Sequence, residues 1–268
     1  MGRWLSVGIL LMGLWFLNGE TALAEVPAGI TESQLQAGDA LAQKAFAASE
    51  AGDFAEAERY WSQLIADFPQ NPAVWSNRGN AKVSQNKLDE AIDDFNQAIE
   101  LAPDQPDPYL NRGAALEGKG EFQAAIADYN RVLELDPQDP LAYNNRGNAE
   151  GSLGDWPQAL ADFQKSMELA PNFAFARANA ALARYELGQK QQAIKEMRDL
   201  VRKYPMFPDM RAALTAALWA QGQQGEAESN WVAAVGMDGR YQNLDWVKTT
   251  RRWPPQMVAA LDQFLHLQ

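Results

Sequence analysis

The sequence predicts an all-α solenoid of six helical hairpins, each 34 residues long. Three residue types recur in phase with that period: alanine, a bulky apolar residue four positions later, and proline twelve positions after the alanine. Because one hairpin is too small to bury its apolar face, successive hairpins must stack. The alanines are Ala57, Ala91, Ala125, Ala159, Ala193 and Ala227. The bulky residues are Trp61, Phe95, Tyr129, Phe163, Met197 and Trp231. The last position is filled by Pro69, Pro103, Pro137, Pro171, Pro205 and Gly239.

Each hairpin has recognisable start and stop signals. Asn71-Pro72 and Asp139-Pro140 combine an N-cap residue with proline at the first helical position. Between the two helices of a hairpin stands a residue that tolerates positive φ: Gly52, Asn86, Gly120, Gly154, Gly188 or Gly222. In the middle repeats Trp75, Tyr109 and Tyr143 each precede a glycine, Gly79, Gly113 and Gly147, by four residues. We expect a bulky side chain over a close helix contact there.

With these residues in place, the chain resembles tetratricopeptide repeat (TPR) proteins over residues 38–239. The resemblance implies a right-handed superhelix in which the first helices of successive hairpins line a concave groove. The fifth and sixth repeats depart from the pattern, because Arg177 and Arg211 replace the aromatic residue and Ala181 and Thr215 replace the glycine. Terminal repeats of stacked arrays are often atypical, so all six repeats are retained.

The first 24 residues are typical of a secretory signal peptide. Arg3 precedes an apolar run from Trp4 to Leu17, and Ala22-Leu23-Ala24 is a small-x-small cleavage site. The alternative is an uncleaved anchor, but the run is shorter than the roughly 20 residues that a membrane-spanning helix needs. We therefore expect export to a periplasm or thylakoid lumen, no integral membrane span after cleavage, and a lead-in at residues 25–37 before the repeats.

Composition limits the function further. The chain has no cysteine, so it has no disulfides and no thiolate chemistry. Residues 1–173 carry 11 basic and 26 acidic groups, whereas residues 174–268 carry 12 and 9. An acidic body argues against nucleic acid as a partner, because binding it requires the neutralisation of phosphates.

Sequence motifs of enzymes are absent. The single histidine, His266, is three residues from the end, and no phosphate-binding loop, serine-hydrolase elbow or zinc-protease motif occurs. Acidic runs such as the one from Asp89 to Asp94 are typical of a solvated helix face. We expect no enzyme activity, no cofactor and no metal site.

Asparagines are the candidate binding residues. By resemblance to the family, Asn77, Asn111, Asn145 and Asn179 share the sixth, groove-facing position of successive repeats, and Asn80, Asn144 and Asn148 lie beside them. Each amide offers a donor and an acceptor together, as an extended peptide backbone requires. The alternative is that these asparagines only make local hydrogen bonds.

Farther along, the groove positions become apolar, with Phe175, Leu182, Tyr185 and Trp219. They could accept apolar side chains of a ligand. They could equally close the solenoid against the C-terminal segment.

Residues 240–268 follow the repeats and form a predicted capping segment. Pro254 and Pro255 end one helical pattern, and an amphipathic stripe from Met257 to Leu265 predicts a helix that covers the end of the sixth repeat. The Trp-Val-x4-Arg-Arg-Trp-Pro-Pro stretch resembles the end of uncharacterised TPR proteins of the thylakoid lumen and cyanobacteria.

The sequence thus predicts an exported TPR adaptor that binds a protein or peptide in its groove. Its expected role is to assist assembly or maintenance of a membrane or photosynthetic complex, with peripheral association through a membrane-protein partner. Two alternatives stay open: a structural subunit that uses its outer face, and a glycan- or peptidoglycan-associated protein.

Overall fold

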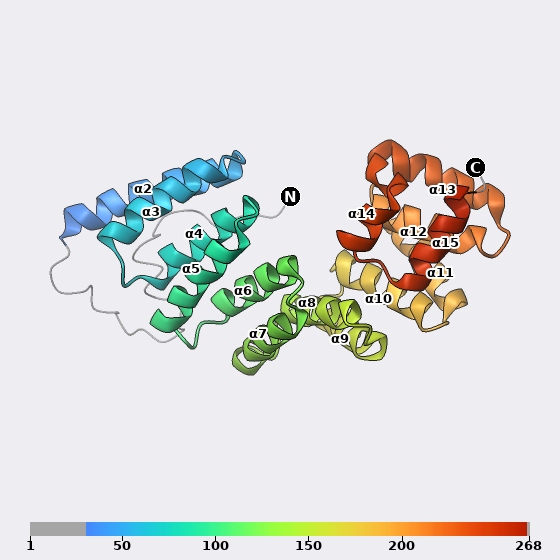
Figure 1. Cartoon of the computed structure of the whole chain (residues 1–268), viewed down its shortest axis with the longest axis horizontal. Coiled ribbons are helices and arrows are strands. Elements are labelled where there is room, and N and C mark those ends of the chain that lie inside the picture. Colours follow the sequence, from blue (N-terminus) through green and yellow to red (C-terminus); the bar gives the residue numbers. More distant parts are fainter. Residues whose placement is uncertain (1–30, 267–268) are drawn as a thin grey trace. The chain divides into compact units, whose positions relative to one another are not determined.

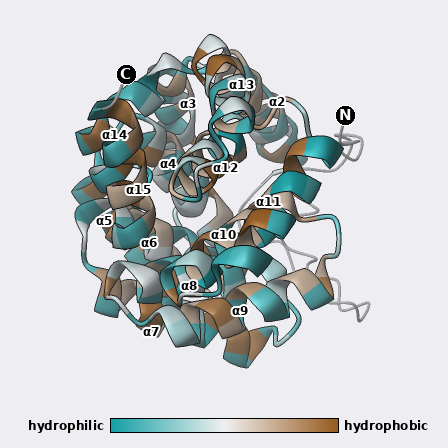
Figure 2. Ribbon diagram, turned by 90° about the vertical axis from the view of Figure 1, so that its right-hand side faces the viewer, coloured by the Kyte–Doolittle hydropathy of each residue, from teal (hydrophilic) through white to brown (hydrophobic). Residues whose placement is uncertain are grey.

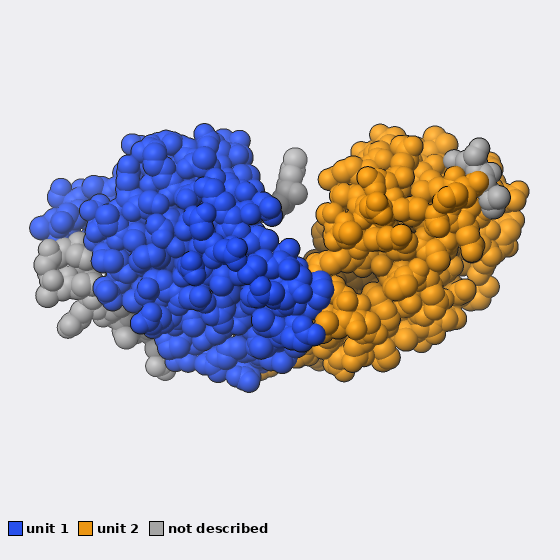
Figure 3. Space-filling view, viewed as in Figure 1, with its two compact units in different colours: residues 1–135 blue, residues 136–268 orange. Residues whose placement is uncertain are grey.

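The computed structural model describes residues 31–266, which form fourteen α-helices and one short 3₁₀ helix. The chain divides into two compact units, residues 1–135 and residues 136–268 (Figure 3). The predicted signal peptide and residues 25–30 of the predicted lead-in lie outside the described residues. Within the described residues, no helix has the length and apolar character needed to cross a membrane.

Unit 1 contains three helical hairpins (Figure 1). Their helices are α2 (Glu32–Glu50) with α3 (Phe54–Asp67), α4 (Pro72–Ser84) with α5 (Leu88–Leu101), and α6 (Pro106–Lys119) with α7 (Phe122–Leu135). Within the unit, each helix from α2 to α6 packs on the next one along the chain. Helix α2 begins inside the predicted lead-in, where Thr31 and Gln34 form a reciprocal capping box.

Unit 2 contains the other three hairpins and the C-terminal segment. The hairpins are α8 (Pro140–Ser152) with α9 (Trp156–Leu169), α10 (Ala174–Glu186) with α11 (Lys190–Lys203), and α12 (Pro208–Trp219) with α13 (Gln224–Met237). The 3₁₀ helix η1 (Gly239–Gln242), α14 (Leu244–Thr249) and α15 (Pro255–His266) follow. Figure 2 shows hydrophilic and hydrophobic residues interspersed along the helices, as amphipathic packing requires.

The predicted turn signals are confirmed. All five predicted glycines between paired helices have φ between 73° and 88°, and Asn86 takes the same conformation with φ 59°. Asparagine is the residue other than glycine that adopts this region most readily. The side chain of Asn71 accepts a hydrogen bond from the amide of Ala73, and Asp139 caps α8 in the same way.

The interlocking of small and large residues is also confirmed, with one correction. All six repeat alanines are fully buried. A Cβ atom on Gly79 would lie 2.6 Å from the ring of Phe95, so glycine is required there. The ring over this glycine therefore belongs to the second helix. Trp75, which we expected at this contact, reaches back instead, and its Nε1 donates to the carbonyl of Pro69 at 2.8 Å.

This backward hydrogen bond explains why the last two repeats tolerate arginine. Tyr109 and Tyr143 also donate to the prolines six residues earlier. Arg177 and Arg211 make the equivalent bond through Nε, at 2.9 Å, to Pro171 and Pro205. The aromatic residue is thus lost from these repeats, but the donor that closes the inter-repeat turn is kept.

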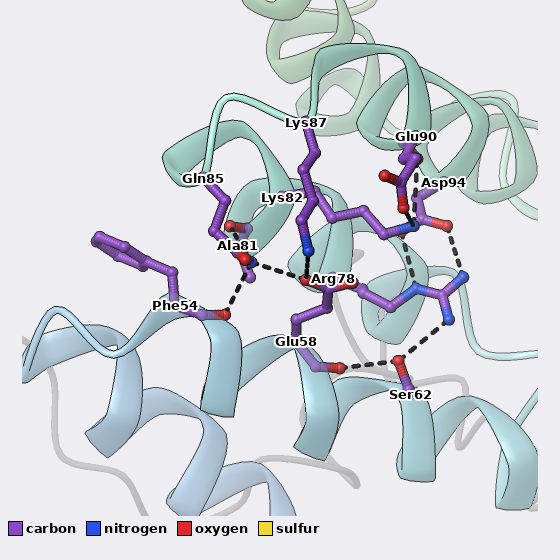
Figure 4. Close-up of polar contacts among 10 residues, drawn as sticks. All are labelled: Phe54, Glu58, Ser62, Arg78, Ala81, Lys82, Gln85, Lys87, Glu90 and Asp94. Carbon is purple, nitrogen blue, oxygen red and sulfur yellow. Dashed lines mark hydrogen bonds and ion pairs between the residues drawn. The ribbon is translucent and has the colours of Figure 1, made fainter.

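A repeated ion pair joins the helices of the middle hairpins. Arg78 donates to both carboxylate oxygens of Asp94 at 2.7 and 2.8 Å and also contacts Ser62 Oγ of the preceding repeat at 3.3 Å (Figure 4). The same bidentate pairing recurs in Arg112–Asp128 and Arg146–Asp162. Because bidentate pairs have fixed geometry, they set the register of the hairpins.

The C-terminal helix α15 packs on α12 and α10, the first helices of the last two repeats. Phe264 of α15 meets Trp219 and Trp231 edge-on, with both ring centroids 5.1 Å away. Helix α15 therefore covers the first helices of two repeats. The prediction placed it only at the end of the sixth repeat.

Candidate functional site

Four of the predicted asparagines form one hydrogen-bonded chain in unit 2. Asn179 Nδ2 of α10 donates to Asn144 Oδ1 at 3.0 Å and to Asn148 Oδ1 at 2.9 Å, both on α8. Asn144 Nδ2 in turn donates to Asn145 Oδ1 at 3.2 Å. This amide chain (Asn144, Asn145, Asn148 and Asn179) links the first helices of the fourth and fifth repeats.

The amide chain keeps unused hydrogen-bonding capacity. Both amide hydrogens of Asn179 are engaged, but its Oδ1 accepts no hydrogen bond from a described residue. The Nδ2 groups of Asn145 and Asn148 likewise have no acceptor among the described residues. Acceptor and donors of this kind are complementary to a peptide main chain.

The asparagines of unit 1 are arranged differently. Asn77 and Asn111 are half-buried and Asn80 is exposed. The side chains of Asn77, Asn80 and Asn111 make no hydrogen bond to a described residue. The one side-chain bond near them goes from Ser84 Oγ to the backbone carbonyl of Asn80. Local hydrogen bonding, the alternative explanation of these asparagines, therefore does not account for Asn77 and Asn111.

A cavity of about 430 Å³ opens beside the amide chain. Its polar lining includes Asn144, Asn148 and Asn179, and its apolar lining includes Leu141, Phe175 and Leu182. Leu141 is 47% exposed and Phe175 is 56% exposed, and both lie at the same cavity rather than singly on the surface. An exposed apolar rim next to convergent polar groups is typical of a binding site.

The other predicted apolar residues have different positions. Tyr185 is only 2% exposed, belongs to the core of unit 2 and does not line the cavity. Trp219 packs against Phe264 of α15. For these two residues, closure of the solenoid against the C-terminal segment describes the observed contacts. Phe175, by contrast, lies edge-on to Phe207 at 5.7 Å and keeps half of its surface free.

Residues 250–254 of the C-terminal segment contribute to the lining of the cavity, through Thr250, Arg251, Arg252 and Pro254. The sequence pattern does not indicate this contribution, because it marks the double proline only as a helix break. The Arg-Arg-Trp-Pro-Pro stretch, polar and aromatic between two helices, is the signal that could have suggested it.

Asp209 holds this segment in place. Its carboxylate, 3% exposed, accepts hydrogen bonds from Tyr241, Arg251 and Trp253 at 2.7 to 3.0 Å. Burial and the charge of Asp209 raise the pKa of Tyr241. Burial opposes the charge of Arg251, but its bonds to Asp209 outweigh that effect and raise its pKa.

Glu150, near the C-terminal end of α8, is a second titratable group of unit 2. Burial and the neighbouring Asp162 carboxylate raise the pKa of Glu150 to about 7. Arg146 acts in the opposite direction, but it is engaged in its bidentate pair with Asp162. No cluster of three or more metal-ligating side chains occurs in residues 31–266.

Models of known families match most of the repeat region. A model described as TPR repeat matches residues 79–120 and 118–154, and two described as tetratricopeptide repeat match residues 140–173, and residues 32–71 and 179–205. The chain belongs to the tetratricopeptide repeat family. TPR proteins are in general non-enzymatic scaffolds for protein interaction.

Solved structures share this fold. A TPR protein from Parabacteroides merdae is 20% identical, with a TM-score of 0.65 over 86% of this chain and 93% of that chain. The Cut9–Hcn1 hetero-tetramer of the APC/C gives 18% identity and a TM-score of 0.70 over 84% of this chain and 42% of that chain. YrrB, described as a TPR protein with an unusual peptide-binding site, gives 17% identity and a TM-score of 0.53 over 67% and 92%. No curated protein sequence matches the chain.

Proposed function

We propose that the protein is an exported interaction scaffold that binds an extended segment of a protein partner at the cavity of unit 2. The observation that carries the proposal is the amide chain beside exposed Phe175. In this arrangement the free Oδ1 of Asn179 accepts from a main-chain amide, and the Nδ2 of Asn148 donates to a main-chain carbonyl. Leu141 and Phe175 bury apolar side chains of the segment.

Two further observations support this function. YrrB, a TPR protein of the same fold, is described as having a peptide-binding site. The N-terminal sequence of this chain and its Arg-Arg-Trp-Pro-Pro stretch favour a periplasm or thylakoid lumen. There the scaffold would assist assembly or maintenance of a membrane or photosynthetic complex, and associate with the membrane through its partner.

Replacing two amides of the chain tests this function. The double variant Asn145→Ala/Asn179→Ala removes hydrogen bonds that contribute about 0.5 to 1.5 kcal/mol each, so we expect partner binding to weaken about tenfold. The measurement is the recovery of crosslinked partners from the native compartment. Circular dichroism checks that the variant stays helical.

The matched control is Asn77→Ala/Asn111→Ala, at the same repeat position in unit 1. These two residues stand outside the amide chain, so we expect the smaller loss. Wild-type recovery of every partner by the unit 2 variant would reject the groove and favour a structural subunit that binds through its outer face.

Export has its own test. Because Ala22-Leu23-Ala24 is the predicted cleavage site, we expect the mature protein to begin at Glu25. Mass spectrometry of the protein from its native host measures the N-terminus. Intact Met1 in a membrane pellet would reject cleavage and leave the uncleaved anchor as the explanation.

A further inference from the structure

The repeated arginine–aspartate ion pair is lost from the sixth repeat. Asp94, Asp128 and Asp162 stand 34 residues apart, and each binds the arginine of its own repeat. The same period places Glu196 in the fifth repeat and Asn230 in the sixth. The position is therefore acidic from the second repeat to the fifth, and the sixth repeat carries a neutral amide there.

Asn230 contacts a different arginine, Arg211. Asn230 is 7% exposed, and its Oδ1 accepts a hydrogen bond from Arg211 Nη1 at 3.1 Å. The Nε of Arg211 donates to the carbonyl of Pro205. Both acceptors are uncharged, and no carboxylate of a described residue forms an ion pair with Arg211. Within the described residues, the positive charge of Arg211 thus has no counter-charge.

Arg211 and Asn230 line a hollow of about 420 Å³ formed by α11, α12 and α13. We call it the outer hollow. Its described lining consists of Arg198, Val201, Arg202, Pro205, Arg211, Leu214, Glu226 and Asn230. The outer hollow shares no lining residue with the cavity of unit 2, so the two are separate sites.

The other charged residues of the outer hollow are two arginines and one carboxylate. The carboxylate of Glu226 is bound by Nε and Nη2 of Arg198 at 2.8 and 2.6 Å. Arg202 is paired with Asp199, and its side chain is 81% exposed. An exposed pair of this kind contributes little to stability, so Arg202 can turn toward a bound anion. In a protein with a formal net charge of −12, the outer hollow is a local site of positive charge.

The corresponding hollow of the fifth repeat shows what the loss of the carboxylate changes. Arg177 takes the place of Arg211 there and makes the same backward hydrogen bond. Its hollow is lined by two basic and two acidic side chains, and Glu196 stands where the sixth repeat has Asn230. These carboxylates repel an anion. The charge balance that favours an anion therefore arises from the residues of the sixth repeat.

We propose that the outer hollow binds a phosphate group and that Arg211 is its main ligand. The proposal does not depend on peptide binding at the cavity of unit 2. The Nη2 group of Arg211 has no acceptor among the described residues, and Arg202 approaches from the rim. Guanidinium groups bind phosphate oxygens through charge-assisted, frequently bidentate hydrogen bonds. Two sources share this chemistry: a soluble phosphate and the headgroup of an anionic lipid.

Met206 is the residue that separates the two sources. It follows Pro205, a lining residue of the outer hollow, and is 79% exposed. Peripheral membrane binding combines burial of apolar side chains with electrostatic attraction to anionic lipids. With a lipid, Met206 enters the apolar layer while Arg211 binds the headgroup. A soluble phosphate leaves Met206 exposed.

The first test is a titration of the purified protein with inorganic phosphate, with chloride at the same ionic strength as the reference. Binding is followed through the NMR amide signals of α11 to α13. We expect Arg211→Gln to weaken phosphate binding about tenfold or more, because a charge-assisted hydrogen bond is lost. The matched control is Arg177→Gln, which loses the same backward hydrogen bond in the fifth repeat and should bind phosphate as the wild type does.

A second variant removes the site without removing an arginine. Asn230→Asp restores the acidic side chain of the middle repeats next to Arg211. The new carboxylate neutralises Arg211, so phosphate binding should again fall about tenfold or more. Circular dichroism and a thermal melt check that both variants stay folded.

Vesicle sedimentation distinguishes the two sources. The protein is mixed with vesicles of phosphatidylcholine, with or without phosphatidylglycerol. Sedimentation with the anionic vesicles that falls several-fold in Met206→Ser, while the phosphate titration of this variant is unchanged, identifies a lipid headgroup. Phosphate binding without sedimentation identifies a soluble phosphate.

Two results would overturn the proposal. One is a wild-type protein that binds neither inorganic phosphate nor anionic vesicles. The other is equal binding by the wild type, Arg211→Gln and Asn230→Asp, because the anion would then bind outside the outer hollow. Neither result bears on the peptide site, whose variants lie on α8 and α10.

Discussion

Units 1 and 2 use the same hairpin but differ in the residues added to it. Both contain the buried alanines, the bidentate arginine–aspartate pair and the turn residues with positive φ. Residues 1–135 carry 9 basic and 20 acidic groups, whereas residues 136–268 carry 14 and 15. Unit 2 also has the C-terminal segment, whose helix α15 packs on α10 and α12, the first helices of the last two hairpins. The repeated residues therefore build the frame and most of the cavity lining, and in unit 2 the C-terminal segment, which lies outside the repeats, adds the rest of that lining.

One repeat position shows the difference within the frame itself. Lys82, Leu116 and Glu150 are successive residues of this position, 34 apart. Lys82 Nζ lies 2.9 Å from Asp94 and adds attraction to that repeat's ion pair. Glu150 instead faces Asp162 and adds repulsion. At the same repeat position, Lys82 therefore adds an attractive interaction in unit 1, and Glu150 adds a repulsive one in unit 2.

The largest expected effect comes from Asp209→Asn in unit 2. The variant leaves the charge of half-buried Arg251 without its buried partner, which costs about 3 kcal/mol, the low end for a buried pair, because part of the Arg251 side chain is accessible to solvent. We expect α14 and α15 to lose protection from hydrogen exchange while α4 to α6 of unit 1 keep theirs. The measurement is native-state hydrogen exchange with a thermal melt.

The matched control is Asp107→Asn, at the same repeat position in unit 1 but exposed. It should change stability by less than about 0.5 kcal/mol. Equal effects at the two sites, or loss of protection throughout both units, would contradict the idea that Asp209 anchors only the C-terminal segment.

The sequence predicts the features of this structure that recur with the repeat, and it does not predict the contacts that lie outside the repeat. The 34-residue period predicts the helices and the buried alanines, because each repeat faces the same packing constraints. The asparagine pattern likewise places Asn144, Asn148 and Asn179 at one site. The contact of Arg252 with Ser152 joins residues 100 positions apart outside any period. No local pattern reports such a pair.

The arginine–aspartate ion pairs are a second feature that the sequence pattern does not predict. Arg78 and Asp94 recur with the period as clearly as the alanines do, but charged residues on amphipathic helices are usually solvated. Their pairing appears only when both helices are placed and each is found to be largely buried. Periodicity thus identifies a repeated position, whereas the partner of a polar side chain depends on tertiary packing.

The next largest effect tests whether the buried repeat alanines pack in the same way in both units. Ala125→Leu in α7 and Ala159→Leu in α9 each insert a large side chain at a fully buried helix crossing, at a cost of about 1 to 3 kcal/mol. We expect similar losses of unfolding free energy in denaturant titrations. The control Ala124→Leu is one position out of phase and exposed, so it should cost less. A loss from Ala124→Leu as large as that from Ala125→Leu would show that the helix register is wrong.

The smallest expected effect concerns pH and is confined to unit 2. The pKa of Glu150 is raised from 4.5 to about 7, so the folded state binds this proton more tightly than the unfolded state does. Stability must then fall as pH rises from about 4.5 through 7, because the unfolded state releases the proton first. Because the Glu150 side chain is only partly buried, screening by solvent reduces the contribution to on the order of 1 kcal/mol.

Replacing Glu150 with glutamine removes this dependence. Glu150→Gln should raise the melting temperature at pH 8 by a few degrees, and the two proteins should converge near pH 4, where the carboxyl group is protonated in both states. In unit 1 the equivalent residue is Leu116, so Leu116→Gln should leave the pH profile unchanged apart from a constant loss of burial. If Glu150→Gln melts at the wild-type temperature at both pH values, the repulsion between Glu150 and Asp162 does not distinguish the two units.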